Sequence, residues 1–524
     1  MKKVFQLLTV LMFSVVFPES VFAQHHHSHA SHYEENWSEA DHHPDHIVLN
    51  LTEDPSTSMS VTWRTDTSIR AGIAEIALAT AAPKFWRYAQ SYNAQTETLD
   101  AREVLHAGVA SNYHSVTFTG LLPDTLYAYR VGDGRYWSEW FQFMTSSDKA
   151  KPFSFLYVGD AQNNILDLWA RLIREGYRTA PEAGFIIHAG DLVNQAHSEQ
   201  DWHEWFTAGS FIHSMLPSIS TPGNHEVQSL NQEDASKNIR SLSVQWRPQF
   251  NLPLNGVPGY EETVYYIDYN DARIISLNSN YAPQEQKAWL EEVLKENSRK
   301  WTIITFHHPI YSASARRDNP LLRNQWKPVF DKYHVDLVLQ GHDHSYARGR
   351  TKAYVENVLD GVNARDYTGT VYVVSVSGGK MYSLEPTGWD AFEAVEQERA
   401  AENTQLFQVI SIDGDRLSYE SYTAIGELYD AFDLRKSPDG TPNRFVERKG
   451  EAIPERRHQN TIPYEDNLPE SLETKVLSEN PGYQILRVFY FEEVEQKGYY
   501  VRLLKENTRM DIKIDTTGKV LEGN

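Results

Sequence analysis

Five short apolar runs in the middle of the chain each end in a compact group of polar residues. An apolar run of this length is typical of a buried strand, and in a layered α/β protein the functional crevice lies beyond the carboxyl ends of the strands. We therefore expect a fold whose strands bring acids, an amide and imidazoles to one edge. The five groups are Gly159-Asp160, Gly190-Asp191, Gly223-Asn224-His225-Glu226, His307-His308-Pro309 and Gly341-His342-Asp343-His344.

These groups together predict a site for two divalent metal ions. Two ions about 3.5–4 Å apart need oxygen and nitrogen donors from several segments and one carboxylate that bridges them, and we expect Asp191 to be that bridge. Such a pair of cations makes a bridging hydroxide available near neutral pH for in-line attack on a phosphate ester. His225 is suited to protonate the leaving group, because a histidine titrates near neutral pH.

Chain length and charge limit the classes of function. A chain of 524 residues is too long for one core, so two or three domains are expected. The formal net charge of -22 argues against nucleic acid as a partner, because affinity for a phosphate backbone comes mainly from basic side chains. A small phosphate ester remains compatible with this charge, since bound metal ions can supply the local positive charge.

Residues 1–23 are predicted to be a secretory signal. Lys2 and Lys3 precede an apolar run at 4–17, and Val21-Phe22-Ala23 places small residues before a cleavage point after Ala23. The run is too short and too interrupted to predict a membrane span, although an uncleaved anchor is the alternative. We expect a mature protein that is secreted or periplasmic, without a membrane span. The chain has no cysteine, which excludes disulfides.

The remaining chain divides by pattern. Strands of alternating pattern and a fibronectin III-like corner at 121–127 indicate a β-sandwich. Strands that alternate with helices at 164–178, 283–297 and 320–333 indicate a layered α/β core. The histidine-rich segment is expected to be disordered, either as a metal-recruiting tract or as a solvated spacer. The predicted parts are 24–46 (histidine-rich), 47–146 (all-β sandwich), 150–435 (α/β catalytic domain), 436–467 (linker) and 468–524 (small α+β domain).

In this order the motifs resemble those of the calcineurin-like metallophosphoesterases and, within them, the purple acid phosphatases. The resemblance covers 150–435, and the sandwich at 47–146 looks like the domain that precedes the catalytic core in plant-type members. It implies that His225 contacts the phosphate and helps protonate the leaving group. It also implies the metal ligands, which are Asp160, Asp191 and His344 for metal one and Asp191, Asn224, His307 and His342 for metal two.

Two positions depart from the family patterns. Asn194 stands where the purple enzymes have a tyrosine, and Gln162 stands where many other members have a histidine. Metal one therefore lacks its usual fourth protein donor, which Gln162, Asn194 or water could replace. We expect two divalent ions such as Zn, Mn or Fe(II), with metal one the more weakly bound.

Other polar residues receive supporting roles. His308 is expected to support its neighbour His307 rather than to coordinate, and Asp343 to orient its loop. Arg348, just beyond His344, is favoured over Arg316 and Arg317 for contact with substrate at the rim. The predicted function is a secreted dinuclear-metal phosphoesterase that hydrolyses small phosphate monoesters. The alternatives are a phosphodiesterase or nucleotide hydrolase on the same site, and an inactive module that binds metal or a partner.

Overall fold

The computed structural model describes residues 39–523, apart from 101–109, 230–239, 315–316, 353–365, 386, 391, 393–394, 438–441, 449–463, 466–467, 493–495 and 506–507. The predicted signal at 1–23 and most of the histidine-rich segment and linker lie outside the described residues. Within those residues, no helix is long and apolar enough to cross a membrane.

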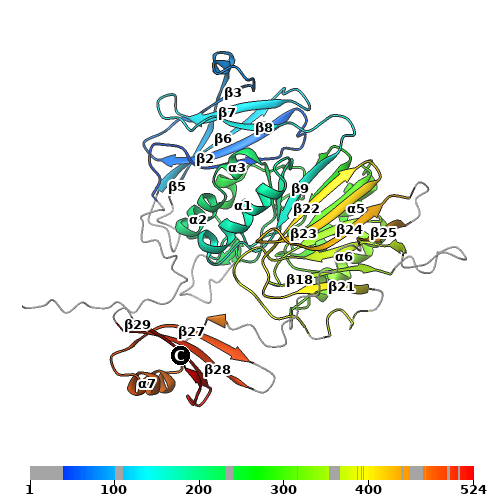
Figure 1. Ribbon diagram of the computed structural model, residues 1–524. Coiled ribbons are helices and arrows are strands. Elements are labelled where there is room, and N and C mark those ends of the chain that lie inside the picture. Colours follow the sequence, from blue (N-terminus) through cyan, green and yellow to red (C-terminus); the bar gives the residue numbers. More distant parts are fainter. Residues whose placement is uncertain are drawn as a thin grey trace, which may run out of the picture.

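The first part of the described chain is a β-sandwich (Figure 1). Its two sheets enclose a core that includes Trp63, Phe118, Tyr129 and Phe143, all buried. At the predicted corner, the backbone N–H of Leu122 donates to the hydroxyl of Tyr127 over 2.9 Å. The elements are β1 (Asp45–Asn50), β2 (Ser58–Asp66), β6 (Ala110–Thr119) and β5 (Gln95–Asp100) in one sheet, and β4 (Gln90–Asn93), β3 (Ile73–Leu78), β7 (Leu126–Gly132) and β8 (Phe141–Met144) in the other, with the 3-10 turn η1 (Phe85–Tyr88).

The central part of the chain, where the catalytic residues are predicted to lie, has two sheets. Strand β1 pairs in parallel with β11, so the first catalytic sheet continues into the sandwich as one twelve-stranded sheet. Besides the sandwich strands, the first contains β19 (Tyr367–Thr368), β25 (Asn443–Glu447), β24 (Leu428–Arg435), β23 (Arg416–Thr423), β22 (Leu406–Asp413), β9 (Phe153–Val158), β10 (Ile186–His188) and β11 (Ser218–Ser220); the second contains β14 (Tyr265–Tyr269), β15 (Ala272–Ser276), β16 (Trp301–Thr305), β17 (Leu337–Gln340), β20 (Val371–Val374), β18 (Tyr346–Thr351) and β21 (Val395–Ala401).

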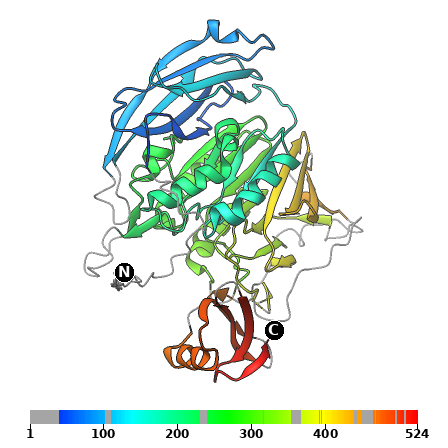
Figure 2. The same cartoon turned by 60° about the vertical axis from the view of Figure 1, so that its left-hand side comes forward.

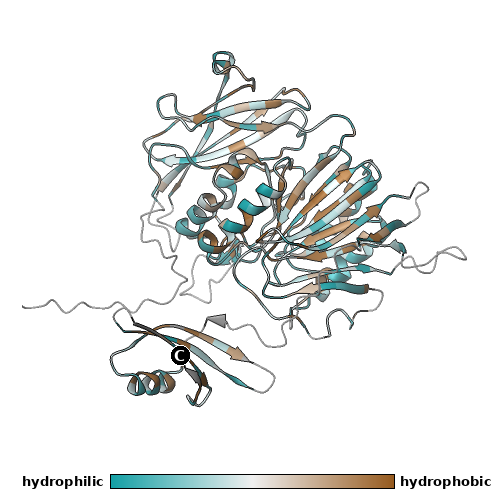
Figure 3. Cartoon of the chain, in the orientation of Figure 1, coloured by the Kyte–Doolittle hydropathy of each residue, from teal (hydrophilic) through white to brown (hydrophobic). Residues whose placement is uncertain are grey.

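Strands of the second sheet bury both faces, as their continuous apolar sequences require. In β16, Ile303 packs into the core shared with the first sheet, whereas its neighbour Ile304 packs with the residues of α5 and α6. The apolar stripes along the strands are visible in Figure 3. The helices are the π-turn η3 (Ile165–Trp169), α1 (Ala170–Thr179), α2 (Glu199–Gly209), α3 (Phe211–Met215), α4 (Trp246–Gln249), α5 (Pro283–Lys295) and α6 (Pro320–Lys332). Strand β12 (Val227–Ser229) pairs antiparallel with β13 (Arg240–Leu242).

The last part of the chain forms its own small α+β unit. Helix α7 (Glu470–Glu479) packs on a five-stranded sheet of β26 (Tyr464–Glu465), β27 (Gln484–Glu492), β28 (Lys497–Lys505), β29 (Thr508–Asp515) and β30 (Val520–Gly523). Its core includes Leu472, Val476 and Ile514 and is separate from the two catalytic cores. Figures 1 and 2 both place this unit beside the catalytic part rather than within it. The predicted order of a sandwich, a layered α/β domain and a small α+β unit is confirmed.

Candidate metal centre

The chain turns sharply where the site residues begin. Asp160, Asp191, His342 and His344 have φ angles of 53°, 51°, 75° and 50°. Residues other than glycine rarely adopt this left-handed conformation, and such strain concentrates at functional sites, where the surrounding structure holds it. These turns follow β9, β10 and β17, so the polar side chains lie at the carboxyl ends of the strands.

Glycine is required where two of these loops touch. A Cβ on Gly223 would lie 2.1 Å from Oδ1 of Asp191, and a Cβ on Gly190 would lie 2.7 Å from the backbone nitrogen of Gly223. Because both distances are far below van der Waals contact, the loops after β10 and β11 can approach this closely only through glycine.

The six residues predicted as ligands lie together in two groups. Donor atoms of Asp191, His307 and His342 all lie within 4.8 Å of one another, as do those of Asp160, Asp191 and His344, so Asp191 belongs to both groups. In the first group, Nε2 of His307 lies 3.1 Å from Oδ2 of Asp191 and 3.2 Å from Oδ1 of Asn224. The set consists of nitrogen and oxygen donors, which suits divalent ions of zinc, manganese or iron.

Backbone carbonyls orient two of the imidazoles. Nδ1 of His307 lies 2.9 Å from the carbonyl oxygen of Ala189, and Nδ1 of His344 lies 3.0 Å from that of Lys380. A ring that donates from Nδ1 to a carbonyl carries its lone pair on Nε2, and Nε2 is the atom that each ring turns toward the acids.

Burial has the largest single effect on the pKa values of Asp160 and His307. It raises the pKa of Asp160 to about 8, and the nearby Asp191 carboxylate contributes to this rise. Burial alone would lower the pKa of His307, but Asp191 more than offsets it and raises that pKa to about 9. Burial therefore opposes ionisation of Asp160 beside the Asp191 carboxylate, and bound divalent cations would favour the ionised form of both groups.

Glu226 has a structural role that the sequence did not reveal. Its buried carboxylate accepts hydrogen bonds from the backbone N–H groups of Asp191, Leu192, Val193 and Gly223, over 2.7–3.3 Å. One side chain therefore holds the loops after β10 and β11 together. Its position directly after His225 in the strand-end motif was the available signal.

Gln162 contributes its side chain to the site, whereas Asn194 contributes its backbone carbonyl. The amide of Gln162 is buried in the second donor group, with Nε2 3.0 Å from both Oδ2 of Asp191 and Nε2 of His344, while Oε1 has no hydrogen-bond partner. The oxygen and nitrogen of an amide have nearly the same size. A flip of this group would therefore place Oε1 where Nε2 now lies, beside Oδ2 of Asp191 and Nε2 of His344. Asn194 instead contributes its backbone carbonyl, which lies 2.6 Å from Nδ1 of His225.

His225 lies at the open side of the centre. Its side chain is 21% exposed, and Nε2 lies 4.0 Å from Oδ2 of Asp191. The backbone N–H of His225 donates to Oδ1 of Asp191 over 2.9 Å, which fixes the residue next to the shared carboxylate. With Nδ1 bonded to Asn194, the other ring nitrogen is left to face a ligand.

His308 and Asp343 lie just outside the donor groups. The ring of His308 is hydrogen-bonded to Ser279 over 2.9 Å and lies beside that of His342. Asp343 accepts hydrogen bonds from the hydroxyl of Ser312 and the backbone N–H of Ala313, over 2.7 and 2.5 Å, and so anchors a neighbouring loop. Both side chains thus contact groups beside the donor residues, and their supporting roles stay a prediction.

The expectation for Arg348 was wrong. Its side chain is fully buried within the sheets, where the guanidinium pairs with Asp430 at 2.8 Å, with Glu447 at 2.9 Å and with Glu398. It therefore joins β18 to β21, β24 and β25 and is not available to a substrate. Strand β18 begins two residues after His344, and successive side chains of a strand point to opposite faces of the sheet. The side chain of Arg348 lies on a face that points into the protein.

Arg317 and Arg240 occupy the place expected for Arg348. The guanidinium of Arg317 donates to the carbonyl of His342 over 2.8 Å, and its side chain is 24% exposed. The exposed Arg240 donates to the carbonyl of Asn224 over 2.6 Å. Each is therefore anchored to the backbone of a predicted ligand. Arg240 had no strand-end motif to identify it, and Arg317 was recognisable only as part of the basic pair Arg316-Arg317.

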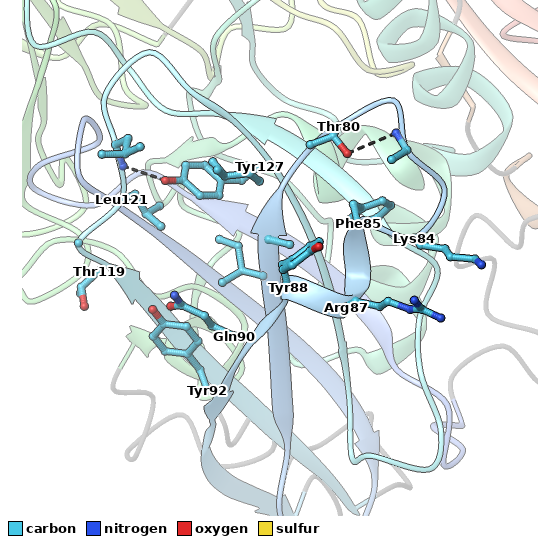
Figure 4. A pocket seen from close by; sticks show the side chains of 16 residues that line it. Thr80, Lys84, Phe85, Arg87, Tyr88, Gln90, Tyr92, Thr119, Leu121 and Tyr127 are labelled. Carbon is cyan, nitrogen blue, oxygen red and sulfur yellow. Dashed lines mark hydrogen bonds between the residues drawn. The ribbon is translucent and has the colours of Figure 1, made fainter.

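A separate cavity of about 570 Å³ lies on the sandwich (Figure 4). Tyr88, Tyr92 and Phe85 line it together with Lys84 and Arg87. None of the six predicted metal ligands is among its lining residues, so this cavity is distinct from the metal centre.

Comparison with known proteins agrees with this geometry. Residues 44–145 match the family model of the purple acid phosphatase N-terminal domain, and residues 153–346 match that of the calcineurin-like phosphoesterases. Residues 153–346 therefore form a domain of the calcineurin-like phosphoesterase family. The domain organisation of the chain is that of the purple acid phosphatases.

Individual relatives are distant. The chain is 28% identical over 284 residues to Fe(3+)-Zn(2+) purple acid phosphatase 12 of Arabidopsis thaliana, covering 50% of this chain and 58% of that protein. It is 26% identical over 392 residues to human acid phosphatase type 7, covering 67% and 83%. A purple acid phosphatase structure from yellow lupin superposes with a TM-score of 0.62 at 19% identity, covering 76% and 75%, which supports the fold.

Proposed function

We propose that this protein is a secreted, metal-dependent phosphatase that hydrolyses small phosphate monoesters. The observation that carries the proposal is the pair of donor groups that share Asp191, with the ring of His225 held beside that shared carboxylate. The segment at 1–23 supplies the export signal in this proposal, with cleavage after Ala23.

Two divalent ions fit the residues present. Asp160, Asp191 and His344 would hold one ion, with the amide oxygen of Gln162 as the additional donor, because that buried amide has an oxygen without a partner. Asp191, Asn224, His307 and His342 would hold the other. Zinc, manganese and iron all suit these donors, and the Arabidopsis relative is named as an iron–zinc enzyme. When bound, such a pair of ions supplies an activated water and holds the phosphoryl oxygens.

The protein groups around the ions have distinct tasks. His225 would donate a proton from Nε2 to the leaving oxygen, because the carbonyl of Asn194 holds Nδ1 and turns the other nitrogen to the open side. Arg317 and Arg240 would bind the outer oxygens of the ester, since both guanidinium groups are fixed to loops of the site. Two basic groups at the rim suit an anionic substrate even in a chain of net charge -22.

The test is hydrolysis by wild type and His225→Ala, measured with an aryl phosphate monoester and the matching diester, alongside metal analysis. We expect His225→Ala to reduce kcat on the monoester about 100-fold or more with metal content unchanged, because it removes the proton donor and none of the ligands. The matched control is His334→Asn, which removes an exposed imidazole in the turn before β17 and should leave kcat unchanged.

Other outcomes distinguish the alternatives. A clear preference of the wild type for the diester would move the assignment to a phosphodiesterase. Full metal content without turnover of either ester would indicate a module that binds metal without catalysis. Equal activity in wild type and His225→Ala would contradict the role given to His225.

A further inference from the structure

A second group of metal-binding side chains lies where the sandwich meets helix α2, apart from the catalytic residues. It consists of Asp45 and His46 at the start of β1 and His203 on α2. One donor atom from each lies within 4.8 Å of the other two. The three residues come from the sandwich and from the catalytic part, so the group spans the junction between them.

The spacing of the two imidazoles matches coordination of one ion. Nε2 of His46 and Nδ1 of His203 are 3.2 Å apart. Two nitrogen ligands at about 2.0–2.1 Å from a tetrahedral zinc ion lie about 3.3 Å from each other. The rings can therefore share an ion without moving, and the same separation allows a hydrogen bond between them when no ion is bound.

The backbone directs His46 toward this point. His46 has a φ angle of 47°, and the pairing of β1 with β2 shifts register between Asp45 and Val48. A bulge of this kind re-aims a side chain, and a left-handed conformation is costly for a residue other than glycine. The ring of His46 also stacks on Phe206 with centroids 4.3 Å apart, which fixes its plane.

The charged side chains around these three residues have a net negative charge, which favours a bound cation. The buried guanidinium of Arg64 pairs with both Asp45, at 2.6 Å, and Glu199. One arginine against two carboxylates leaves a net charge of about -1 in a largely buried space, which favours a bound cation. Asp45 keeps further lone pairs for an ion, since each carboxylate oxygen can accept more than one contact, and its side chain is 32% exposed, which provides access.

From this geometry we propose a structural transition-metal site, with zinc as the first choice, formed by Asp45, His46 and His203. Two imidazoles and one carboxylate, with water as the fourth ligand, are donors that zinc accepts. The ion would join β1 of the sandwich to α2 of the catalytic part and so stabilise their junction. This site is independent of the catalytic pair of ions, because the two sets share no residue.

The test compares zinc binding by the full-length wild type and His203→Ala after chelation and readdition of zinc. We expect the variant to bind about one zinc ion fewer per chain, because a three-ligand site loses an imidazole. We also expect the zinc-dependent rise in Tm to be smaller by roughly 2–4 °C or more. Histidines at 24–43 can also bind zinc, so the difference between variants is the readout rather than the total.

Three further variants make the result decisive. His334→Asn removes an exposed imidazole and should match the wild type in both measurements. His203→Gln keeps most of the side-chain volume and should behave like His203→Ala, which provides a folded variant if the alanine chain is unstable. In Asp191→Asn, which disables both catalytic donor groups, the zinc bound through His203 should remain. Equal zinc content and an equal rise in Tm for wild type and both His203 variants would overturn the proposal.

Discussion

Arg348 and Arg317 carry the same charge, but the side chain of Arg348 is buried and that of Arg317 is partly exposed. Arg348 is enclosed by acidic partners, whereas Arg317 pairs with one carboxylate among the described residues, Asp343 at 3.4 Å, and donates to the backbone of His342. A guanidinium with donors left over can bind a phosphate group, and a buried one whose donors are all used by carboxylates cannot. The residue at the surface is therefore the one that we expect to meet the substrate.

This difference predicts how substitutions at the two positions affect kinetics. Arg317→Ala should raise KM for a monoester about tenfold, which corresponds to about 1.4 kcal/mol, because a contact to the anionic ester is lost. Arg348→Ala should leave KM unchanged in the folded fraction but lower Tm, because it removes the nearest cationic partner of the buried Asp430. Steady-state kinetics and thermal unfolding of both variants check this. A rise in KM with Arg348→Ala and none with Arg317→Ala would contradict the assignment.

At the scale of elements, the buried pair of Arg348 and Asp430 ties β18 to β24 in the other sheet. Burial raises the pKa of Asp430, but Arg348 and the hydrogen bonds from Arg348 and Tyr346 more than offset this and bring it below its ordinary value. A carboxyl whose pKa is lower in the folded protein stabilises the fold above its unfolded pKa. That contribution is lost as the pH falls through the folded pKa.

Asp430→Asn should therefore destabilise the protein by about 2–4 kcal/mol near neutral pH, since it leaves a buried arginine with fewer partners. The difference in unfolding free energy between wild type and variant should stay constant above about pH 5 and shrink below about pH 4. Denaturant unfolding at a series of pH values measures it. Asp271→Asn, at the turn between β14 and β15, is the control and should show neither effect. A difference that grows as the pH falls would contradict the expected direction of this dependence.

At the scale of the whole molecule, the sandwich and the catalytic part are joined in one sheet, whereas the C-terminal unit has its own core. The catalytic core ends with β25, whose Glu447 pairs with Arg348, and with Arg448, which pairs with Glu420. No residue of the C-terminal unit belongs to the described donor groups. The unit is therefore expected to be dispensable for metal binding and hydrolysis.

A chain that ends after Arg448 should keep the metal content and kcat of the full-length protein, because both catalytic cores remain complete. A chain that ends after Ser437 removes β25 as well and should unfold at a lower temperature, because Arg348 loses Glu447 and β24 loses one of its two neighbouring strands. Metal analysis, kinetics and Tm of the two truncated chains provide the comparison. Loss of turnover in the longer one would show that the C-terminal unit contributes to the site.

The sequence by itself predicted the donor residues and their order along the chain. Asp160 and Asp191 follow apolar strands of the first sheet and His342 follows an apolar strand of the second, and parallel strands within a sheet bring their carboxyl ends to one edge. Helices α5 and α6 were equally predictable, because each begins with a proline that favours the first turn and follows with an apolar face.

Only the tertiary structure decided which other polar residues belong to a site. Arg348 is buried because of the direction of β18, Arg317 reaches His342 from 25 residues earlier in the chain, and His46 meets His203 from 157 residues away. Such contacts depend on strand register and on the packing of one element against another. Local sequence patterns carry information about neighbours three or four residues apart, and they do not encode which distant side chains will meet.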